Sequence, residues 1–224
     1  MNTPCPIRPD PTAEPAPRRA RGRPRKTAGE RDDGNRRQAL LHAAARLFRQ
    51  QGFAATSTRD IAAAAGMRSG SPFYHFESKE ALLAAVMLEG MDRAVHRQQV
   101  AIVASATEPM PVPRECLRVL VRSHLEVLLG PDSDFIPVML YEWRSLSPAQ
   151  RTEVNHLKDR YEAAWVPVLR ALHDSGELRG DPGLARLMLF GALNWSVQWF
   201  DPARRASLDD LADTALHLFL KDPA

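Results

Sequence analysis

A basic run near the start of the chain, RGRPRK at residues 21–26, has residue types and a spacing that suit ligand binding. Glycine has no side chain and proline disfavours helix at the residue before it, so the run is expected to be slim and extended. Such a strand can lie in a narrow A·T-rich minor groove, whose negative potential attracts arginine. The run predicts DNA contacts from Arg21, Arg23 and Arg25, with a solvated basic tail as the alternative.

The surroundings of this run favour an arm outside any folded core. Seven of the 18 prolines fall in the first 24 residues, among Ala, Thr and charged residues. A segment with so few large apolar side chains cannot offset the entropy lost on ordering, so residues 1–32 are predicted to be a disordered basic arm. The run itself resembles an AT-hook, which implies binding in the minor groove.

Charge is distributed unevenly along the chain. The net charge of +3 divides into +5 for residues 1–37, +2 for residues 38–80 and −4 for residues 81–224. A basic first part joined to an acidic remainder is expected when one part meets a polyanion and the other part has a different task. The distribution favours double-stranded DNA as the partner of the first 80 residues.

Catalytic and metal-binding patterns are missing from the sequence. It contains no Gly-x-Ser-x-Gly elbow, no phosphate-binding P-loop and no His-Glu-x-x-His, and its seven histidines have no metal-ligand spacing. Two cysteines, Cys5 and Cys116, supply neither a disulfide framework nor the four close ligands of structural zinc, which indicates a reducing compartment. An enzyme is therefore not expected, and neither is a cofactor or a bound metal.

Length and composition indicate a globular protein. The chain has 224 residues, of which 44% are apolar and 25% charged, enough for one large domain or two small ones. No stretch approaches the roughly 18 apolar residues of a membrane span, and the first twenty residues hold no apolar signal-peptide core. The sequence predicts a cytoplasmic protein without membrane contact.

Helical signals continue from residue 33 to the end of the chain. Gly52 and Gly66 are placed as helix stops, and Ser57 with Asp60 forms a capping box. No stretch shows the sustained alternation of β-branched residues that is typical of strands. The sequence predicts an all-α fold of about nine helices, at residues 34–51, 58–65, 67–76, 78–105, 113–129, 134–144, 147–175, 181–200 and 207–220.

The second and third of these helices form a helix-turn-helix. They are short, a turn with glycine separates them, and the second can enter a major groove while the first braces it. Residues 35–87 resemble the N-terminal domain of TetR-family transcriptional repressors, through STRDIA at the second helix, the AAG turn, and YHF followed by SKEAL. The resemblance implies a DNA-binding domain at 33–87 and a ligand-binding and dimerisation domain at 88–224.

The resemblance also implies roles for single residues. The bracing helix would place two side chains against phosphate, the recognition helix would present its first residues to bases and its aromatic and histidine to phosphate, and the next helix would begin with a phosphate contact. These residues are Thr58, Arg59, Arg68, Ser69, Gly70, Ser71, Tyr74, His75 and Lys79. Phe73 and Phe76 are expected in the core instead, and His75 has the alternative of a surface residue without a role.

Pro72 departs from the family pattern, which usually has an aliphatic residue at this place in the recognition helix. Proline lacks an N–H donor and is tolerated only in the first turn of a helix. The recognition helix is therefore expected to start late, near Ser71, or to be distorted there. The departure leaves base contacts by Ser69 and Gly70 open.

The last two helices carry more apolar residues than one face of a monomer needs. Paired across a two-fold axis, they would form a four-helix bundle, as the resemblance implies. The alternative is that these residues are the core of a single chain. The predicted homodimer interface comprises Leu184, Leu187, Met188, Gly191, Leu211, Ala215, Leu218 and Phe219.

The fourth to seventh helices are expected to enclose an effector pocket. Aromatic residues are common in apolar pockets, although each candidate has plain core as its alternative. The candidates for the pocket wall are Met139, Leu140, Trp143, Tyr161, Trp165 and Trp195, with Arg144 as a partner for a ligand phosphate. The runs YEWRSLSPAQRTEV and GALNWSVQWFDP are similar to members of the family that respond to acyl-CoA thioesters.

These observations predict a dimeric repressor that a small hydrophobic effector, such as an acyl-CoA, releases from a palindromic operator. An architectural minor-groove protein acting through the arm at residues 21–26 is the alternative. The two differ in what removal of the arm does to DNA binding. Loss of the arm weakens a repressor and abolishes binding by an architectural protein.

Overall fold

The computed structural model describes residues 28–67, 72–106, 112–131, 133–204 and 206–221. This part of the chain folds into ten α-helices and two short 3-10 helices, with one isolated antiparallel bridge between Leu178 and Leu220, which confirms the all-α prediction. The helices are α1 (Ala28–Ala55), α2 (Thr58–Ala64), α3 (Pro72–His75), α4 (Lys79–Ser105), α5 (Pro113–Leu129), α6 (Phe135–Glu142), α7 (Pro148–Ala163), α8 (Trp165–Asp174), α9 (Pro182–Trp195) and α10 (Leu208–Phe219).

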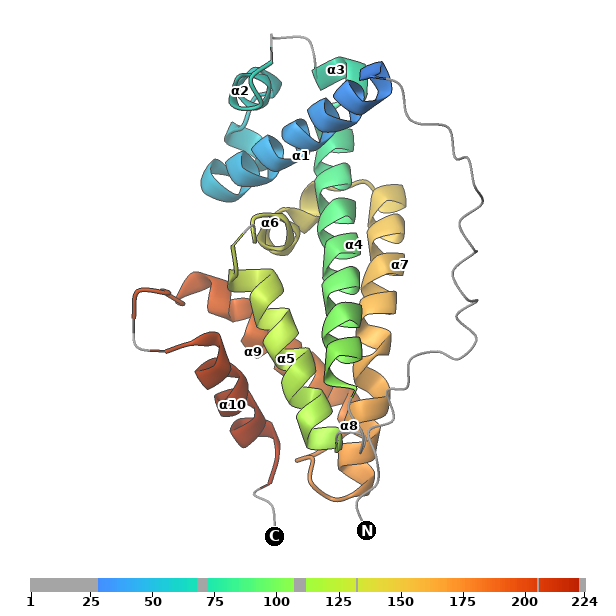
Figure 1. Ribbon diagram of the computed structural model, residues 1–224, viewed down its shortest axis with the longest axis vertical. Helices are drawn as coiled ribbons and strands as arrows, with labels where there is room; N and C mark the ends of the chain where they lie inside the picture. Colours follow the sequence, from blue (N-terminus) through green and yellow to red (C-terminus); the bar gives the residue numbers. More distant parts are fainter. Residues whose placement is uncertain (1–27, 68–71, 107–111, 132, 205, 222–224) are drawn as a thin grey trace.

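The helices form a small head and a larger body that share one long helix. Helices α1, α2 and α3 gather at one end of the molecule, and α4 runs from this head down the length of the body (Figure 1). In the body, α4 packs against α5, α6 and α7, α10 lies on the side of α5 away from α4, and α9 crosses behind α5 toward α8. The expected domain boundary between residues 87 and 88 therefore falls inside α4.

Helix α1 begins earlier than the sequence indicated. It starts at Ala28, so the prediction that residues 28–32 belong to a disordered arm is wrong. The helical direction breaks at Gly52, whose φ of 82° is the left-handed conformation that glycine adopts without strain, as expected of a helix stop. Leu40, Ala44 and Phe48 on the inner face of α1 are buried.

The head contains two short helices, α2 and α3, and the sequence predicted where each begins and ends. Helix α2 begins after the Ser57 cap and ends before Gly66, whose φ is 71°. The described part of helix α3 is Pro72–His75, and the expected start near Ser71 lies outside the described residues, so it stays a prediction. Phe76, just past its end, is buried with 8% of its surface exposed, which confirms its predicted place in the core.

The long helix expected at residues 147–175 is two helices. The capping box of Ser147 with Gln150 opens α7 as predicted, but α7 ends at Ala163 and α8 begins at Trp165. Pro167 has no N–H to donate to the carbonyl of Ala163, and its ring crowds that carbonyl, so the helix cannot continue unbroken. Two other helices end earlier than expected, because α6 and α9 pass into the 3-10 turns Trp143–Ser145 and Ser196–Gln198.

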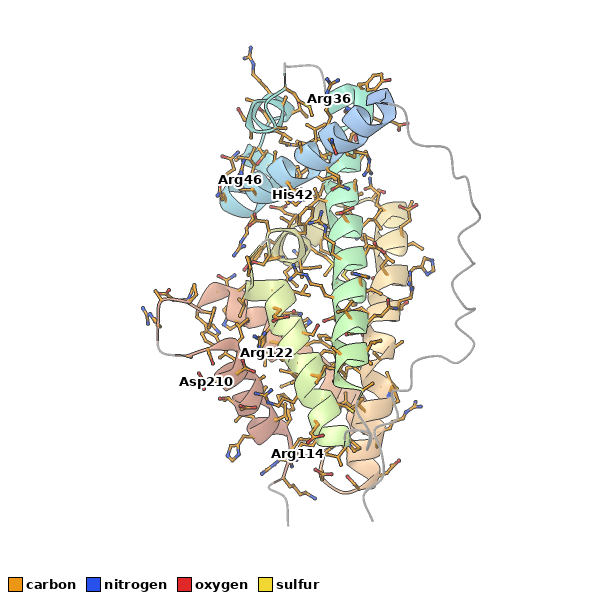
Figure 2. The ribbon with its side chains drawn as sticks, in the orientation of Figure 1. Arg36, His42, Arg46, Arg114, Arg122 and Asp210 are labelled. Carbon is orange, nitrogen blue, oxygen red and sulfur yellow. The ribbon has the colours of Figure 1, made fainter. Side chains whose placement is uncertain are left out.

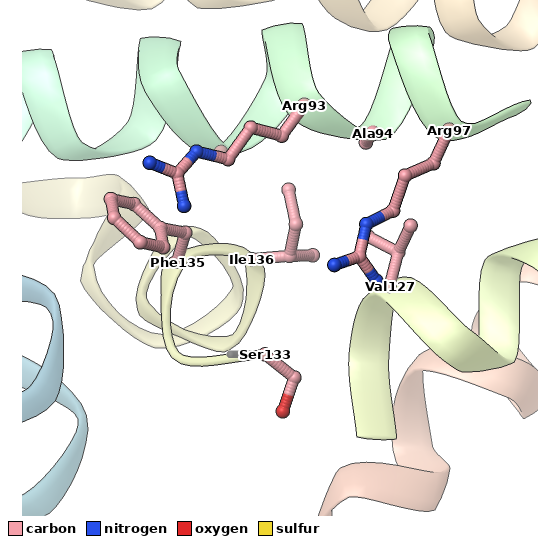
Figure 3. A pocket seen from close by; sticks show the side chains of 8 residues that line it. Arg93, Ala94, Arg97, Val127, Ser133, Phe135 and Ile136 are labelled. Carbon is pink, nitrogen blue, oxygen red and sulfur yellow. The ribbon is translucent and has the colours of Figure 1, made fainter. Parts of the chain in front are cut away.

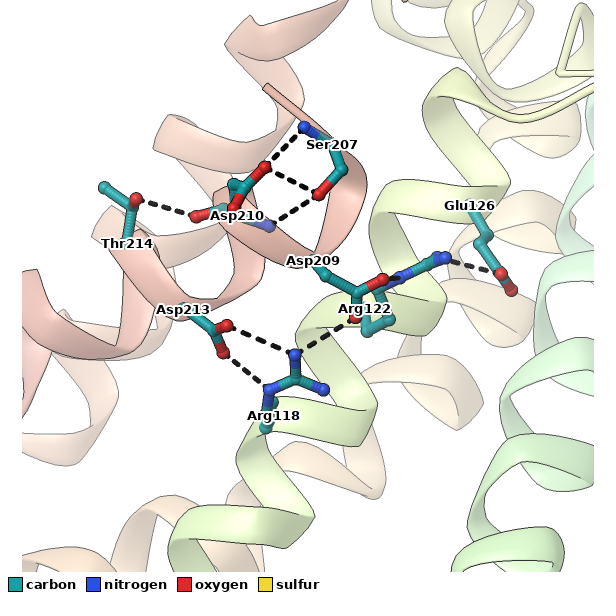
Figure 4. A network of polar contacts seen from close by, with 8 residues as sticks. All are labelled: Arg118, Arg122, Glu126, Ser207, Asp209, Asp210, Asp213 and Thr214. Atoms are coloured by element: carbon teal, nitrogen blue, oxygen red, sulfur yellow. Dashed lines mark hydrogen bonds and ion pairs between the residues drawn. The ribbon is translucent and has the colours of Figure 1, made fainter. Parts of the chain in front are cut away.

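Ion pairs hold α10 against α5. Arg118 bonds to Asp213 and Asp209, and Nε of Arg122 lies 3.2 Å from Oδ2 of Asp209 (Figure 4). These groups are partly exposed, and single pairs of this kind contribute little, so the network fixes the position of α10 more than it adds stability. The hydrogen bond from Arg118 to Asp213 raises the pKa of the arginine.

A glycine allows the close approach of α4 to α6. A Cβ added at Gly90 would lie 2.8 Å from Cβ of Phe135 and 3.4 Å from its backbone carbonyl carbon. Neither atom is the end of a flexible side chain, so any larger residue would push α6 away from α4. The position of α6 thus depends on the missing side chain at this residue.

We predict that Gly90→Ala lowers the free energy of unfolding by about 1–3 kcal/mol, because the added methyl overpacks the α4–α6 contact. Gly34→Ala in α1 is the matched control, since a Cβ there meets nothing within 4 Å. It should raise stability by about 0.5–1 kcal/mol through helix propensity. Urea unfolding of the three proteins measures both changes, and equal effects of the two substitutions would contradict the steric argument.

Candidate functional site

The start of α2 is fixed by a reciprocal cap. The backbone N–H of Asp60 donates to Oγ of Ser57 at 3.1 Å, and the N–H of Ser57 donates to Oδ2 of Asp60 at 3.2 Å. The hydrogen bond from the Ser57 hydroxyl lowers the pKa of Asp60. The cap places Thr58 and Arg59 in the first turn of α2, where Thr58 is half-buried and Arg59 exposed. Arg59 is therefore free to reach a phosphate outside the head.

Helix α3 presents an exposed aromatic side chain. Tyr74 has 80% of its surface exposed, and its ring meets that of the half-buried His75 edge to face at 5.2 Å. Phe76 turns inward, below the guanidinium of Arg37 at 5.1 Å. The other predicted contacts of this region and of the arm lie outside the described residues and stay predictions: Arg21, Arg23, Arg25, Arg68, Ser69, Gly70 and Ser71.

Lys79 has partners within the head. Its Nζ donates to the carbonyl oxygens of Phe53 at 2.8 Å and Thr56 at 2.9 Å, and it lies 4.2 Å from the centre of the Phe53 ring. An ammonium has three donors, so one remains for a phosphate. The two bonds tie the start of α4 to the turn between α1 and α2. The geometry thus gives Lys79 a positioning role in addition to the predicted phosphate contact.

The body contains a cavity of about 270 Å³ between α4, α5, α6, α7 and α9. Met139 and Tyr161, both predicted for a pocket, line it, and so do Leu187 and Gly191, which were predicted for the dimer interface. The remaining lining residues are Met91, Ala94, His124, Val127, Ile136, Lys158, Glu162, Phe190 and Asn194. The walls are mostly apolar, with polar groups at a few points, as in sites for small molecules.

A hydrogen-bonded row of neutral polar groups forms one wall of the cavity. Nδ1 of His124 lies 2.8 Å from the Tyr161 hydroxyl, and its Nε2 lies 3.1 Å from Oδ1 of Asn194. Because the amide oxygen can only accept, Nε2 carries the proton and Nδ1 accepts from the tyrosine. Behind this wall, Gln98 donates to the carbonyl of Tyr161 and accepts from the indole of Trp165.

Burial sets the protonation of this wall. Desolvation lowers the pKa of His124 to about 4, against the weaker opposite effect of its hydrogen bond to Asn194. Burial also raises the pKa of Tyr161 above its usual range. Both groups are therefore neutral near pH 7, so this wall of the cavity is polar but carries no charge.

Charged side chains stand at one edge of the same cavity. Glu162 lies 3.8 Å from Nζ of Lys158 and is paired with Arg186. The carboxylate is thus shared between two cations, which leaves this edge weakly positive.

The structure places the other predicted pocket residues away from this cavity. Trp165 is fully buried behind the wall, with its ring 4.7 Å from that of Phe190. Leu140 and Trp143 pack on the core from α6 and its 3-10 turn, and Arg144 is exposed there. Trp195 has 65% of its surface exposed. Aromatic content alone could not tell which face of each helix turns to the cavity.

His124 and Asn194 were missed by sequence reasoning. His124 lies on the stripe of α5 that carries Leu117, Leu120 and Leu128, all of them buried. A histidine at an apolar position of an amphipathic helix is a readable signal, because a buried imidazole needs partners. Asn194 gave no comparable signal, since its role depends on how α9 packs on α5.

Helix α9 turns an apolar face to solvent. Leu184, Leu187 and Met188 expose 65%, 59% and 67% of their surfaces, and Gly191 and Trp195 continue the stripe at helical spacing. Beside it, a groove of about 120 Å³ lies between α9 and α10, with the 67% exposed Leu218 in its wall. Leu211 and Phe219 are half-buried in the groove, and Ala215 is buried within the chain.

Two further findings concern metals and membranes. Among the described residues, no group of three or more His, Cys, Asp or Glu is placed to hold a metal ion. Within the same residues, each helix is too short or too polar to cross a bilayer.

Comparison with known proteins gives two family matches. Residues 40–86 match the model of bacterial regulatory proteins of the tetR family, and residues 111–222 match the tetracyclin repressor-like C-terminal domain. The HTH-type transcriptional repressor KstR2 of Rhodococcus jostii (strain RHA1) is 32% identical over 190 residues, which cover 83% of this chain and 89% of the relative.

Solved structures give the same picture. The superantigen PfiT is 38% identical, with a TM-score of 0.68 over 84% of this chain and 97% of that one. AibR in complex with isovaleryl coenzyme A and operator DNA is 26% identical, with a TM-score of 0.72 over 82% of this chain and 97% of that one. The head and the body are thus found together in these proteins.

The buried imidazole predicts a pH dependence of stability. The unfolded chain binds a proton at His124 near pH 6.5, whereas the folded chain does so only near pH 4, so stability falls as the pH is lowered between these values. The expected loss is about 3 kcal/mol. Urea unfolding between pH 4 and 7 measures it, and His124→Gln should remove this part of the slope. His156→Gln on the exposed side of α7 is the control, and an unchanged slope in His124→Gln would contradict the assignment.

Proposed function

The chain belongs to the TetR family of bacterial regulatory proteins, and from this premise we propose that it is a dimeric transcriptional repressor that a small apolar effector releases from DNA. The observation that carries the proposal is the position of α4. This helix begins in the head, at the Lys79 contacts, and its Met91 and Ala94 line the cavity of the body. A ligand in the cavity therefore touches the helix on which the head is mounted.

DNA binding is supported by the side chains that the head exposes. Arg59 and Tyr74 stand on α2 and α3, the two short helices of the helix-turn-helix, and neither is buried. The first 80 residues carry the excess positive charge of the chain. In such a protein, α3 enters the major groove, and two heads of a dimer meet half-sites about one helical turn, roughly 34–36 Å, apart.

The effector class is proposed from the cavity and the relatives together. The cavity offers apolar walls and one uncharged polar wall whose groups already bond to one another, which suits an acyl chain better than a sugar or an amino acid. AibR was crystallised with isovaleryl coenzyme A, and the KstR2 of Mycobacterium tuberculosis is described as a ketosteroid transcriptional regulator. An acyl-CoA thioester is accordingly the effector that we propose.

Release from DNA follows from differential affinity. A ligand shifts an equilibrium between two conformations only as far as it binds one of them better. Filling the cavity requires α4, α6 and α9 to take one relative arrangement, and α4 transmits this arrangement to the head. The repressor then holds its two reading heads at a spacing that the operator no longer matches.

Titration of the purified protein with duplex DNA from the region upstream of its own gene tests DNA binding. We expect a salt dependence of affinity that becomes shallower by about one unit of slope in Arg59→Gln, because one phosphate contact is lost. Lys79→Gln should instead lower the stability of the head, since its two carbonyl bonds are lost. Failure to bind any such duplex at low salt would contradict the proposal.

Removal of the arm separates the repressor from its architectural alternative. Deletion of residues 1–27 leaves α1 complete, because that helix starts at Ala28. A repressor should then bind its operator more weakly and with a shallower salt slope, while its preference for that sequence remains. Loss of all DNA binding in the shortened chain would favour the architectural protein.

The dimer is proposed from the apolar face of α9. A stripe of three large apolar side chains with about 60% or more of their surfaces exposed is unusual unless another surface covers it. A second copy supplies the same stripe across a two-fold axis, and the small Gly191 lets the two helices approach closely. The four-helix arrangement of α9 and α10 with their symmetry mates would bury these residues.

We predict that Met188→Glu converts the dimer to a monomer, because a charge in a desolvated apolar interface is costly. Sedimentation velocity at micromolar concentration measures the change. Val103→Glu is the matched control, since Val103 on α4 is also apolar and 61% exposed but lies outside the stripe. A wild-type protein that sediments as a monomer, or equal behaviour of the two variants, would contradict this interface.

A further inference from the structure

A second, smaller cleft lies where the head meets the body. It has a volume of about 30 Å³ and opens between α4, the end of α5 and the start of α6. Arg93 and Arg97 extend from successive turns of α4 toward this cleft, across from Phe135 and Ile136 (Figure 3). Gly90, Ala94, Val127 and Ser133 complete its lining. Both side chains thus line one small space, with the guanidinium of Arg93 over the Phe135 ring and that of Arg97 beside Val127.

The cleft carries a positive charge that its surroundings do not neutralise. Nε of Arg93 lies 2.8 Å from a carboxylate oxygen of Glu89, and NH1 of Arg49 lies 2.9 Å from a carboxylate oxygen of Asp134. Arg97 makes no hydrogen bond or ion pair with any residue that the structure describes, and its side chain is exposed. One cation of the three is therefore available to an external anion.

The cleft and the main cavity share part of their walls. Ala94, Val127 and Ile136 line both spaces. These three buried side chains stand between the two spaces, so a ligand that occupies both has to displace at least one of them. The main cavity is thus apolar and neutral beside His124, and the neighbouring cleft is basic at Arg97.

Arg93 also contacts the head. Its NH2 lies 3.1 Å from Nε2 of His42 and 3.4 Å from Oε1 of Gln38, both on α1. Its guanidinium stands 4.5 Å from the centre of the Phe135 ring, which meets the His42 ring edge to face at 5.1 Å. His42 lies on the side of α1 that faces the body (Figure 2). Arg93 is therefore a direct connection between the cleft and the head.

We propose that this cleft binds the acidic head group of the effector, with Arg97 as its main contact and Arg93 as the residue that passes occupancy on to α1. The inference rests on the proposed function, because it assigns a subsite to the same ligand. The ligand is then an amphipathic anion: an apolar chain in the main cavity and a carboxylate or phosphate at the arginines.

The size of the cleft limits what enters it. Its volume of about 30 Å³ is far smaller than the 270 Å³ of the main cavity. It accepts the oxygens of a carboxylate or phosphoryl group, whereas a nucleotide has to remain outside, beyond the exposed Arg97. The cleft therefore recognises a negative charge at one end of the ligand, and it does not contact the rest of a large head group.

The coupling to the head follows from the donors of Arg93. Its NH2 is the group nearest to His42 and Gln38, and an anion drawn to the arginine pair competes with these weaker partners. A guanidinium turned toward the anion loosens the contact between α4 and α1. An acidic ligand should accordingly change DNA affinity more than a neutral ligand of the same chain length.

Calorimetric titration with four probes tests the subsite: decanoate, decanoyl-CoA, decanol and coenzyme A alone. We expect the two acidic decanoyl ligands to bind more tightly than decanol. Arg97→Gln should weaken the acidic ligands about three- to tenfold and leave decanol unchanged. Arg170→Gln, on an exposed position of α8, is the matched control and should change none of them. Loss confined to decanoyl-CoA assigns the subsite to phosphate, and loss with both ligands assigns it to any acidic group.

The role of Arg93 is read from DNA affinity with and without ligand. In Arg93→Gln, decanoyl-CoA should still bind, but the ratio of DNA affinities in its absence and presence should fall toward that found with decanol. Equal binding of decanoate and decanol by the wild type, unchanged affinities in Arg97→Gln, or an unchanged ratio in Arg93→Gln would overturn the inference. A protein that prefers acidic ligands but binds no DNA would instead refute the proposed function and leave the subsite standing.

Discussion

The continuity of α4 is the constraint on which the rest of the structure depends. This helix has 27 residues without a break, and ten of them are buried, from Leu82 in the head to Gln98 in the body. A helix packed on both domains cannot tilt in one without moving in the other. Lys79 fixes its start to the α1–α2 turn, and Gly90 brings it close to α6. Any ligand that changes the spacing of α6 and α4 therefore acts on the head.

The neutral polar wall sets the other limit on a ligand. His124, Tyr161 and Asn194 satisfy one another, so the wall is stable without a ligand and offers few unused donors. An apolar chain can lie against it at little cost, whereas a charged group would lose its hydration with no ion to replace it. The charge of an acidic ligand must consequently point away from this wall, and the neighbouring cleft at Arg97 is a basic site that shares part of its lining with the cavity.

Local signals predicted the helices well and the cavity poorly. Caps and stops act within one turn, so Ser57, Gly66 and Ser147 marked helix ends correctly. The break at Ala164 was also readable, because Pro167 removes a local donor, and it was overlooked in favour of a single long helix. Which residues line the cavity depends on how each helix is rotated about its axis in the packed bundle. Trp165 and Trp195 were therefore predicted for the same pocket, although one is fully buried and the other mostly exposed.

The charge of the body also bears on where an anion can bind. Residues 81–224 are acidic overall, and six of the twelve arginines that the structure describes there make ion pairs with carboxylates. On α5, Arg114 bonds to Glu177, while Arg118 and Arg122 bond to carboxylates of α10. Figure 2 shows Arg114 and Arg122 well away from the head. The net acidic charge of the body thus disfavours an anion over most of its surface, and Arg97 on α4, the helix that carries the head, is a cation beside the cavity that pairs with no described carboxylate.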